Sequence, residues 1–147
     1  PAYGVLAAGG SLEPSTLWLG MPLMLFGLAF VLAVQIPDLE ADRLGGKSTW
    51  VARHGRGPAF VLLTLALALA ALTLFGASAW AASDSPAAPG DLGLLALLPL
   101  GVSVLALRLR HHDQRATTRA AVRTLFALVA FCLLADGYLL LIATRSI

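Results

Sequence analysis

Charged residues are scarce in this sequence. Asp, Glu, Lys and Arg make up 12% of its 147 residues, whereas hydrophobic residues make up 59% and the mean hydropathy is +0.84. A soluble domain carries about 25% charged residues, so the composition excludes a soluble fold. It predicts an all-α, polytopic transmembrane bundle, because helices satisfy their own backbone hydrogen bonds in lipid.

Cysteine is also scarce, and this excludes further classes of protein. The single Cys132 lies within an apolar run, so neither an internal disulfide nor a thiolate metal cluster can form, and we expect it to serve packing. The formal net charge is only +2, and the basic residues are clustered. This pattern predicts membrane topology and gives no support for nucleic-acid binding.

Long apolar stretches are what the sequence has in abundance. Four of them predict membrane spans, at residues 17–36, 58–82, 92–107 and 124–144, within a single transmembrane domain. The last contains one acid, Asp136, which we expect to face the bundle interior, either as a functional group or held by a neighbouring helix.

The basic residues lie almost entirely between alternate spans. They occur in residues 37–57, hereafter the motif segment, and in or beside the predicted loop 108–119: Arg43, Lys47, Arg53, Arg56, Arg108, Arg110, Arg115, Arg119 and Arg123. The positive-inside rule therefore predicts that both segments face the cytoplasm, in a multi-pass protein of the cell membrane.

The start of the chain resembles the end of a helix. It opens on Pro1 with ten small or apolar residues, PAYGVLAAGG, which are too few to cross a bilayer. We therefore expect the sequence to be the C-terminal part of a longer protein.

The motif segment combines acids and bases in a way that suggests phosphate chemistry. If the first span continues as a helix past Pro37, Asp38 and Asp42 share one face, one turn apart. Mg²⁺ is usually held by one or two carboxylates together with substrate phosphate oxygens, and Lys47 with nearby arginines would bind the same phosphates. These residues favour a metal–diphosphate site, although the same acid spacing also occurs in solvated loops.

The stretch PDLEADRLGGKSTWVARHG, which begins at Pro37, resembles the second aspartate-rich motif of the UbiA superfamily of intramembrane prenyltransferases. In that motif D-x-E-x-D-R is followed by a Gly, a basic residue, a Thr and a later Gly. The matching positions are Asp38, Glu40, Asp42, Arg43, Gly46, Lys47, Thr49 and Gly55.

The resemblance implies a bundle of about nine helices with two such motifs, each binding Mg²⁺ that bridges to an isoprenoid diphosphate. This chain would be the C-terminal half of that bundle. The first motif, N-D-x-x-D-x-x-x-D, does not occur in the sequence. This half alone would therefore be inactive.

The resemblance also implies the role of each residue. Asp38 and Asp42 would be the catalytic, metal-binding acids, and Lys47 would bind the prenyl diphosphate with support from Arg43 and Arg53. The acceptor would be aromatic or otherwise lipophilic, as in the biosynthesis of quinones or related lipids. The surrounding membrane lipid would be a further partner.

Three neighbouring positions have less certain roles. Glu40 points away from the two aspartates on a helix, so we expect it to orient Arg43 or Lys47. Thr49 could cap a helix or contact substrate. Gln35 stands where many members carry an Asp or Asn, so it brings no charge.

Two other readings compete with a prenyltransferase. A non-catalytic polytopic membrane protein or transporter fragment would use the charged loop only to set topology. A CDP-alcohol phosphotransferase would carry D-G-x-x-A-R followed by G-x-x-x-D-x-x-x-D, and the sequence has neither.

Overall fold

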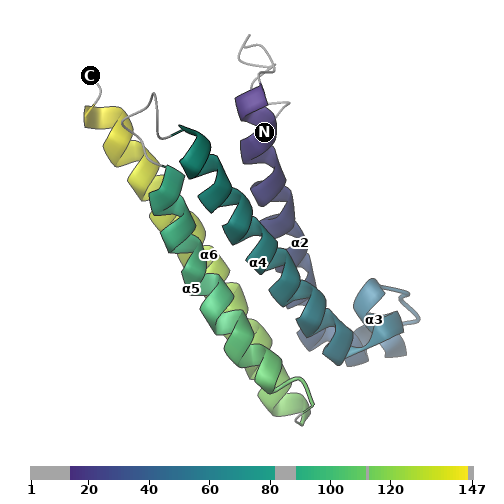
Figure 1. Cartoon of the computed structure of the whole chain (residues 1–147). Coiled ribbons are helices and arrows are strands. Elements are labelled where there is room, and N and C mark those ends of the chain that lie inside the picture. The colour runs from purple at the N-terminus through teal and green to yellow at the C-terminus, as the bar shows by residue number, and fades with distance from the viewer. Residues whose placement is uncertain (1–13, 82–88, 112, 146–147) are drawn as a thin grey trace.

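A computed structural model describes residues 14–81, 89–111 and 113–145; the opening residues 1–13 lie outside this part. Within it the chain forms helices only: α2 (Pro14–Leu44), α3 (Trp50–His54), α4 (Arg56–Ala81), α5 (Pro89–Arg108) and α6 (Gln114–Arg145). The four long helices form a bundle, and the short α3 lies at one end of it (Figure 1). The expected all-α bundle is confirmed.

Three helices are long and apolar enough to cross a membrane, at Gly20–Leu44, Arg56–Gly76 and Gln114–Tyr138. The apolar part of α5, Leu92–Arg108, is shorter. Three of the four expected spans thus lie in helices long enough to cross a membrane, and the expected span 92–107 lies in the shorter apolar helix.

The helices extend further into the polar segments than the sequence suggested. Helix α2 continues through Pro37 to Leu44, and α6 begins at Gln114, ten residues before the expected span. Pro37 removes one backbone donor, but Ile36 and Leu39 on either side of it are buried, so packing maintains the helix. The predicted loop 108–119 is therefore mostly helix.

The start of α6 has its own local cause. The Asp113 carboxylate accepts a hydrogen bond from the Ala116 backbone N–H at 3.2 Å, which is an N-terminal cap. Thr117 and Thr124 on the next turns are fully buried and bond back to carbonyls of their own helix. Their burial holds the polar first turns of α6 against the bundle.

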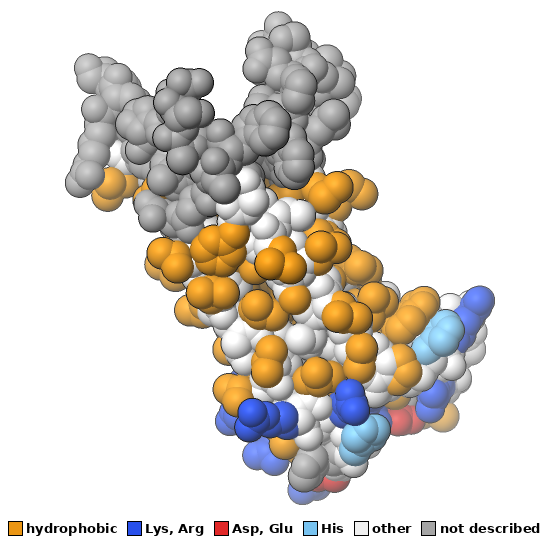
Figure 2. All heavy atoms as spheres, in the orientation of Figure 1, with side chains coloured by type: hydrophobic (Ala, Val, Ile, Leu, Met, Phe, Trp, Pro, Cys, Tyr) orange, Lys and Arg blue, Asp and Glu red, His pale blue; other side chains and the backbone are white. Residues whose placement is uncertain are grey.

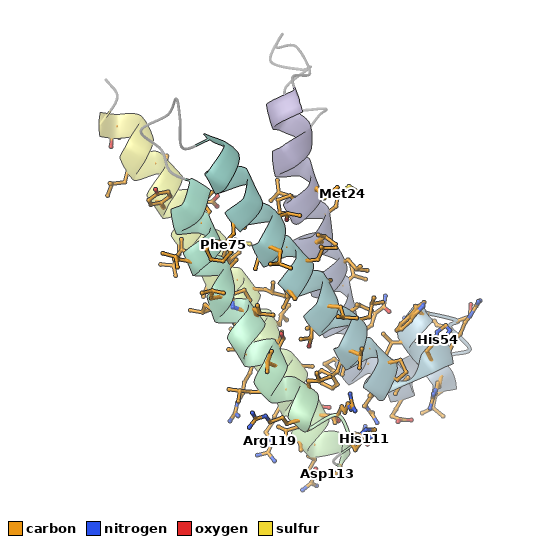
Figure 3. The ribbon with its side chains drawn as sticks, viewed as in Figure 1. Met24, His54, Phe75, His111, Asp113 and Arg119 are labelled. Carbon is orange, nitrogen blue, oxygen red and sulfur yellow. The ribbon has the colours of Figure 1, made fainter. Side chains whose placement is uncertain are left out.

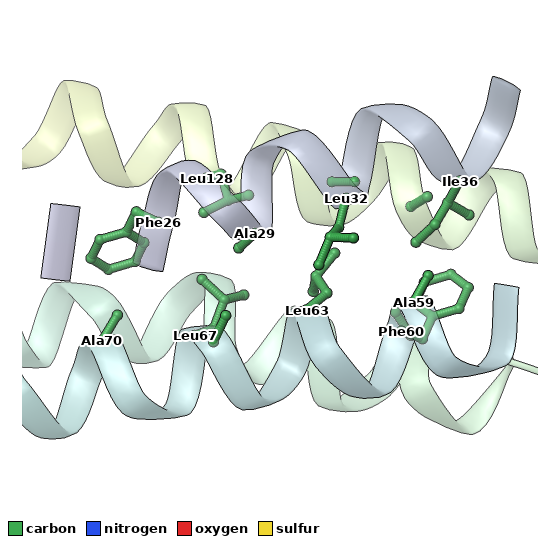
Figure 4. Close-up of a cluster of buried hydrophobic side chains, with 14 of the residues drawn as sticks. Phe26, Ala29, Leu32, Ile36, Ala59, Phe60, Leu63, Leu67, Ala70 and Leu128 are labelled. Atoms are coloured by element: carbon green, nitrogen blue, oxygen red, sulfur yellow. The ribbon is translucent and has the colours of Figure 1, made fainter. Parts of the chain in front are cut away.

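The core lies where α2 faces α4 (Figure 4), and α5 and α6 also contribute to it. Its members recur at helical spacing on two helices: Phe26, Ala29, Leu32 and Ile36 on α2, and Ala59, Phe60, Leu63, Leu67 and Ala70 on α4; Ala96 and Ala106 of α5 and Leu128 of α6 also belong to it. Alanine is frequent among the buried residues, and small side chains allow the close helix packing that is common in membranes.

Charge is confined to one end of the visible surface. Figure 2 shows hydrophobic side chains over the middle of the bundle, and Lys, Arg, His and acidic side chains at the end that holds α3 and the α5–α6 turn. This distribution is the one expected where a lipid-facing band meets a polar boundary.

Gly93 of α5 packs against the Phe75 ring of α4. A Cβ atom at this position would lie 2.9 Å from a ring carbon of Phe75. The Phe75 ring can therefore occupy this place only because residue 93 has no side chain. Gly101, two turns later on α5, has nothing within 4 Å of its Cβ position.

We expect Gly93→Ala to destabilise the bundle and Gly101→Ala to leave it unchanged or slightly stabilised. Overpacking costs about 1–3 kcal/mol, whereas replacing an unhindered helical Gly with Ala gains about 0.5–1 kcal/mol. Thermal unfolding of the full-length protein in detergent measures both. Equal melting temperatures for the two variants would show that α4 and α5 do not meet at Gly93.

Candidate functional site

The two motif acids lie on a continuous helix, as the proposed site requires, but in different environments. Asp38 and Asp42 stand one turn apart near the end of α2. Asp42 is 7% exposed, whereas Asp38 is exposed and makes no hydrogen bond or ion pair with any described residue. The carboxylate of Asp38 is therefore open to a ligand.

Helix α2 ends in a tight glycine cap. Gly46 has a φ of 69°, a left-handed conformation that favours glycine. The Lys47 N–H donates to the Asp42 carbonyl at 2.8 Å, and the Gly46 N–H donates to the Arg43 carbonyl at 3.2 Å. This pair of bonds is a Schellman motif, and it turns the chain back so that Lys47 and Thr49 return to the acids.

Both oxygens of the Asp42 carboxylate have partners. Lys47 Nζ lies 3.3 Å from Oδ1, and the Thr49 hydroxyl donates to Oδ2 at 3.2 Å. The Asp42 side chain is 10% exposed and that of Lys47 is 71% exposed. An ion pair with one end so exposed contributes at most about 1 kcal/mol, so Lys47 can change partners at little cost.

Thr49 caps a helix, which is one of the two roles the sequence left open, and it also contacts Asp42. Its hydroxyl oxygen accepts from the Ala52 N–H at 3.2 Å, which caps α3, while the same hydroxyl donates to Asp42. Arg43 Nε donates to the Ala52 carbonyl at 3.0 Å, and Val51 is fully buried. Helix α3 is thus fastened to the end of α2.

Glu40 binds a residue that the sequence did not suggest. Its carboxylate lies 3.1 Å from Arg56, the first residue of α4, so the expectation that it orients Arg43 or Lys47 is wrong. Arg43 and Lys47 are committed to Ala52 and Asp42 instead. The partners are 16 residues apart, and no local spacing rule connects them.

Two buried polar atoms beside this network lack a partner among the described residues: Gln35 Oε1 and Arg56 Nε. Gln35 lies one turn before Asp38, so it shares a face of α2 with the motif acids. Buried polar atoms nearly always bind something, so these two are available to a ligand.

Two further residues from the sequence analysis stand apart. Arg53 is exposed on α3, and its guanidinium has no hydrogen-bond partner in the part of the chain that is described. Asp136 is exposed on α6, so it does not face the interior that the described helices form among themselves.

The site carries too few ligands to enclose a metal alone. Among the described residues no group of three or more His, Cys, Asp or Glu side chains could hold an ion. Two carboxylates one turn apart fit a Mg²⁺ ion only if phosphate or water oxygens complete its shell.

Comparison with known proteins identifies a family. The UbiA prenyltransferase family matches residues 1–131, which include the whole motif segment, and the resemblance seen in that segment is confirmed. No curated protein and no solved structure matches the chain significantly.

We expect Thr49→Val to loosen α3 and the Asp42 carboxylate together. The variant keeps the shape but loses the cap and the hydroxyl donor, each worth about 1 kcal/mol. Thr49→Ser should restore both bonds. Thr73→Val on α4, which removes only a bond to the Ala70 carbonyl, is the matched control. Melting temperature and proteolysis within residues 45–55 measure the effect, and a Thr49→Val protein as stable and as protected as the control would contradict the double role.

Proposed function

The chain belongs to the UbiA prenyltransferase family, and we propose that it transfers an isoprenoid chain from a prenyl diphosphate to an aromatic or other lipophilic acceptor, as in the biosynthesis of quinones or related lipids. The observation that carries the proposal is the end of α2, which brings an exposed acid, a buried acid and an exposed lysine to one place. Acids for a cation and bases for phosphate oxygens are the requirements of a diphosphate site.

Asp38 and Asp42 are the residues that would hold Mg²⁺. Asp38 has no protein partner among the described residues, and Gln35 Oε1, a neutral oxygen one turn earlier, is also unpartnered. This donor set fits a hard cation that takes its remaining oxygens from the substrate. When bound, the ion would neutralise negative charge on the departing diphosphate.

Lys47 would exchange one anion for another. In the structure it neutralises Asp42, which has a nearly buried carboxylate. When a diphosphate is present, the flexible lysine can swing to it, because its ammonium group is already mostly in solvent. Thr49 continues to donate to Asp42 after the exchange, so the acid remains oriented.

The remaining bases support the same step. In the transfer, the allylic carbon–oxygen bond breaks, the diphosphate leaves with the electron pair, and the acceptor carbon forms the new bond and loses a proton. Arg53, exposed on α3, can bind a departing phosphate, and Arg43 positions α3 through the Ala52 carbonyl. Cationic groups stabilise the charge that develops on the leaving group.

The motif segment would form one part of a two-part site. The chain carries the second of the family's two acidic motifs, and the first does not occur in its sequence. We place the site at the cytoplasmic boundary, since the basic residues gather at this end of the bundle (Figure 2).

The topology-only alternative and the prenyltransferase are separated by a charge-conserving exchange. We expect the double variant Asp38→Ala, Ala41→Asp to abolish prenyl transfer in the full-length protein and to keep its insertion and orientation. Ala41 is exposed on the same helix, so the exchange moves the carboxylate off the Asp42 face while it preserves net charge.

Prenyl transfer and Mg²⁺-dependent binding of prenyl diphosphate are measured in membranes that hold equal amounts of protein. Asp113→Ala, which removes an acid from the α6 cap outside the motif segment, should retain activity. Wild-type activity in the exchanged variant would leave only a topological role for the charge.

We expect Lys47→Met to weaken binding of the prenyl diphosphate by about 10- to 100-fold, because a charge-assisted hydrogen bond contributes about 1.5–3 kcal/mol. Lys47→Arg should recover part of the loss, since it keeps the positive charge but replaces the compact ammonium group with a planar guanidinium. The KM for the prenyl diphosphate, measured beside the KM for the acceptor, tests this. An unchanged diphosphate KM would exclude the exchange of partners.

A further inference from the structure

A concave surface lies beside the motif acids and is lined by neither of them, although Trp50 and Gly57 of the motif segment contribute to it. It is a groove of about 410 Å³, hereafter the α4 groove. Its walls are Val61, Leu62 and Leu65 of α4, with Trp50 of α3 at one side and Arg110 and His111 of the α5–α6 turn at the other.

The α4 groove faces away from the core. On α4, Leu63 and Leu67 are fully buried against the rest of the bundle, whereas Leu65 is 60% exposed and Trp50 is 39% exposed. Residues two apart on a helix point to different sides. The apolar wall therefore lies on the outer surface of the described helices.

The rim of the groove carries positive charge that no acid neutralises. Arg110 Nε donates to His111 Nε2 at 2.9 Å, which orients the guanidinium and leaves its terminal N–H groups available. In the described chain no carboxylate pairs with Arg110, and the nearby Asp113 is engaged in the cap of α6. The lining itself contains no acid.

The groove joins the charged end of the bundle to an apolar span. His111 lies at the α5–α6 turn and His54 on α3, both at the charged end of the bundle (Figure 3). From there the apolar wall extends along α4 into the span Arg56–Gly76. Tryptophan is enriched at such a boundary, where headgroups meet hydrocarbon.

We propose that the α4 groove binds an anionic glycerophospholipid of the surrounding membrane. One acyl chain lies along Leu62 and Leu65, and the headgroup phosphate accepts hydrogen bonds from Arg110 and His111. Basic pockets between helices on the cytoplasmic side are a recurrent form of lipid site. A prenyl diphosphate shares this chemistry but needs a cation, and the lining offers no carboxylate to hold one.

The test uses the full-length protein in neutral detergent, titrated with phosphatidylglycerol or with phosphatidylcholine of the same oleoyl chains. We expect phosphatidylglycerol alone to raise the melting temperature strongly. Arg110→Gln should raise the phosphatidylglycerol concentration for half-maximal stabilisation about fivefold, since one basic side chain near an anionic surface contributes about 1 kcal/mol. Arg108→Gln is the matched control, because Arg108 is exposed two residues away and does not line the groove.

Leu65→Ala serves as a second variant, because its side chain is exposed and its loss does not open the core. It should weaken the stabilisation by phosphatidylglycerol, because the acyl chain loses part of its apolar wall. Equal stabilisation by the two lipids in the wild type, or equal loss in the Arg110 and Arg108 variants, would overturn the proposal.

Prenyl transfer by the same variants separates this site from the motif site. We expect the KM for prenyl diphosphate to be unchanged in Arg110→Gln, whether or not the motif acids prove catalytic. A raised KM with an unchanged response to phosphatidylglycerol would show that the groove takes the substrate and not a membrane lipid.

Discussion

The bonds of Asp42 hold together the turn that joins α2 to α3 at the polar end of this protein. Its backbone carbonyl closes the glycine cap of α2, and its carboxylate holds both Lys47 and Thr49. One residue thus ends a helix, returns the chain and starts α3 through the Thr49 cap. A nearly buried carboxylate needs such partners, because an unpaired charge taken out of water is costly. The need to satisfy this acid fixes the local fold before any substrate is present.

The same arrangement gives the two acids different tasks. Asp42 is oriented by protein groups, whereas Asp38 remains exposed and without a protein partner in the described chain. A site that must bind and release a charged leaving group benefits from one fixed ligand and one accessible ligand. The Glu40–Arg56 pair supports this end from the other side, because it ties α2 to the first residue of α4.

Much of this was readable from the sequence, and the rest depended on tertiary contacts. Apolar run length located the helices, and the residue pattern of the motif segment identified the family. Pro37 is a strong local signal for a break, yet the buried Ile36 and Leu39 overrode it. The basic stretch 108–119 was predicted to be a loop, but its residues from Gln114 onward are helical, because the buried Thr117 satisfies its hydroxyl by bonding to the Gln114 carbonyl of the same helix. Glu40 and Arg56 meet only because α2 and α4 pack side by side. Their spacing of 16 residues along the chain does not predict that contact.

The early start of α6 has a mechanical consequence for the whole bundle. Arg115, Arg119 and Arg123 recur every four residues and are all exposed, so they form one charged stripe along a rigid helix. The opposite stripe, with Thr117, Ala120 and Ala121, is buried. A turn of α6 about its own axis would carry guanidinium groups into the core and bring buried residues out. The arginine stripe therefore fixes the rotation of α6 about its own axis at the membrane surface. Because other helices pack against α6, it also constrains their orientation.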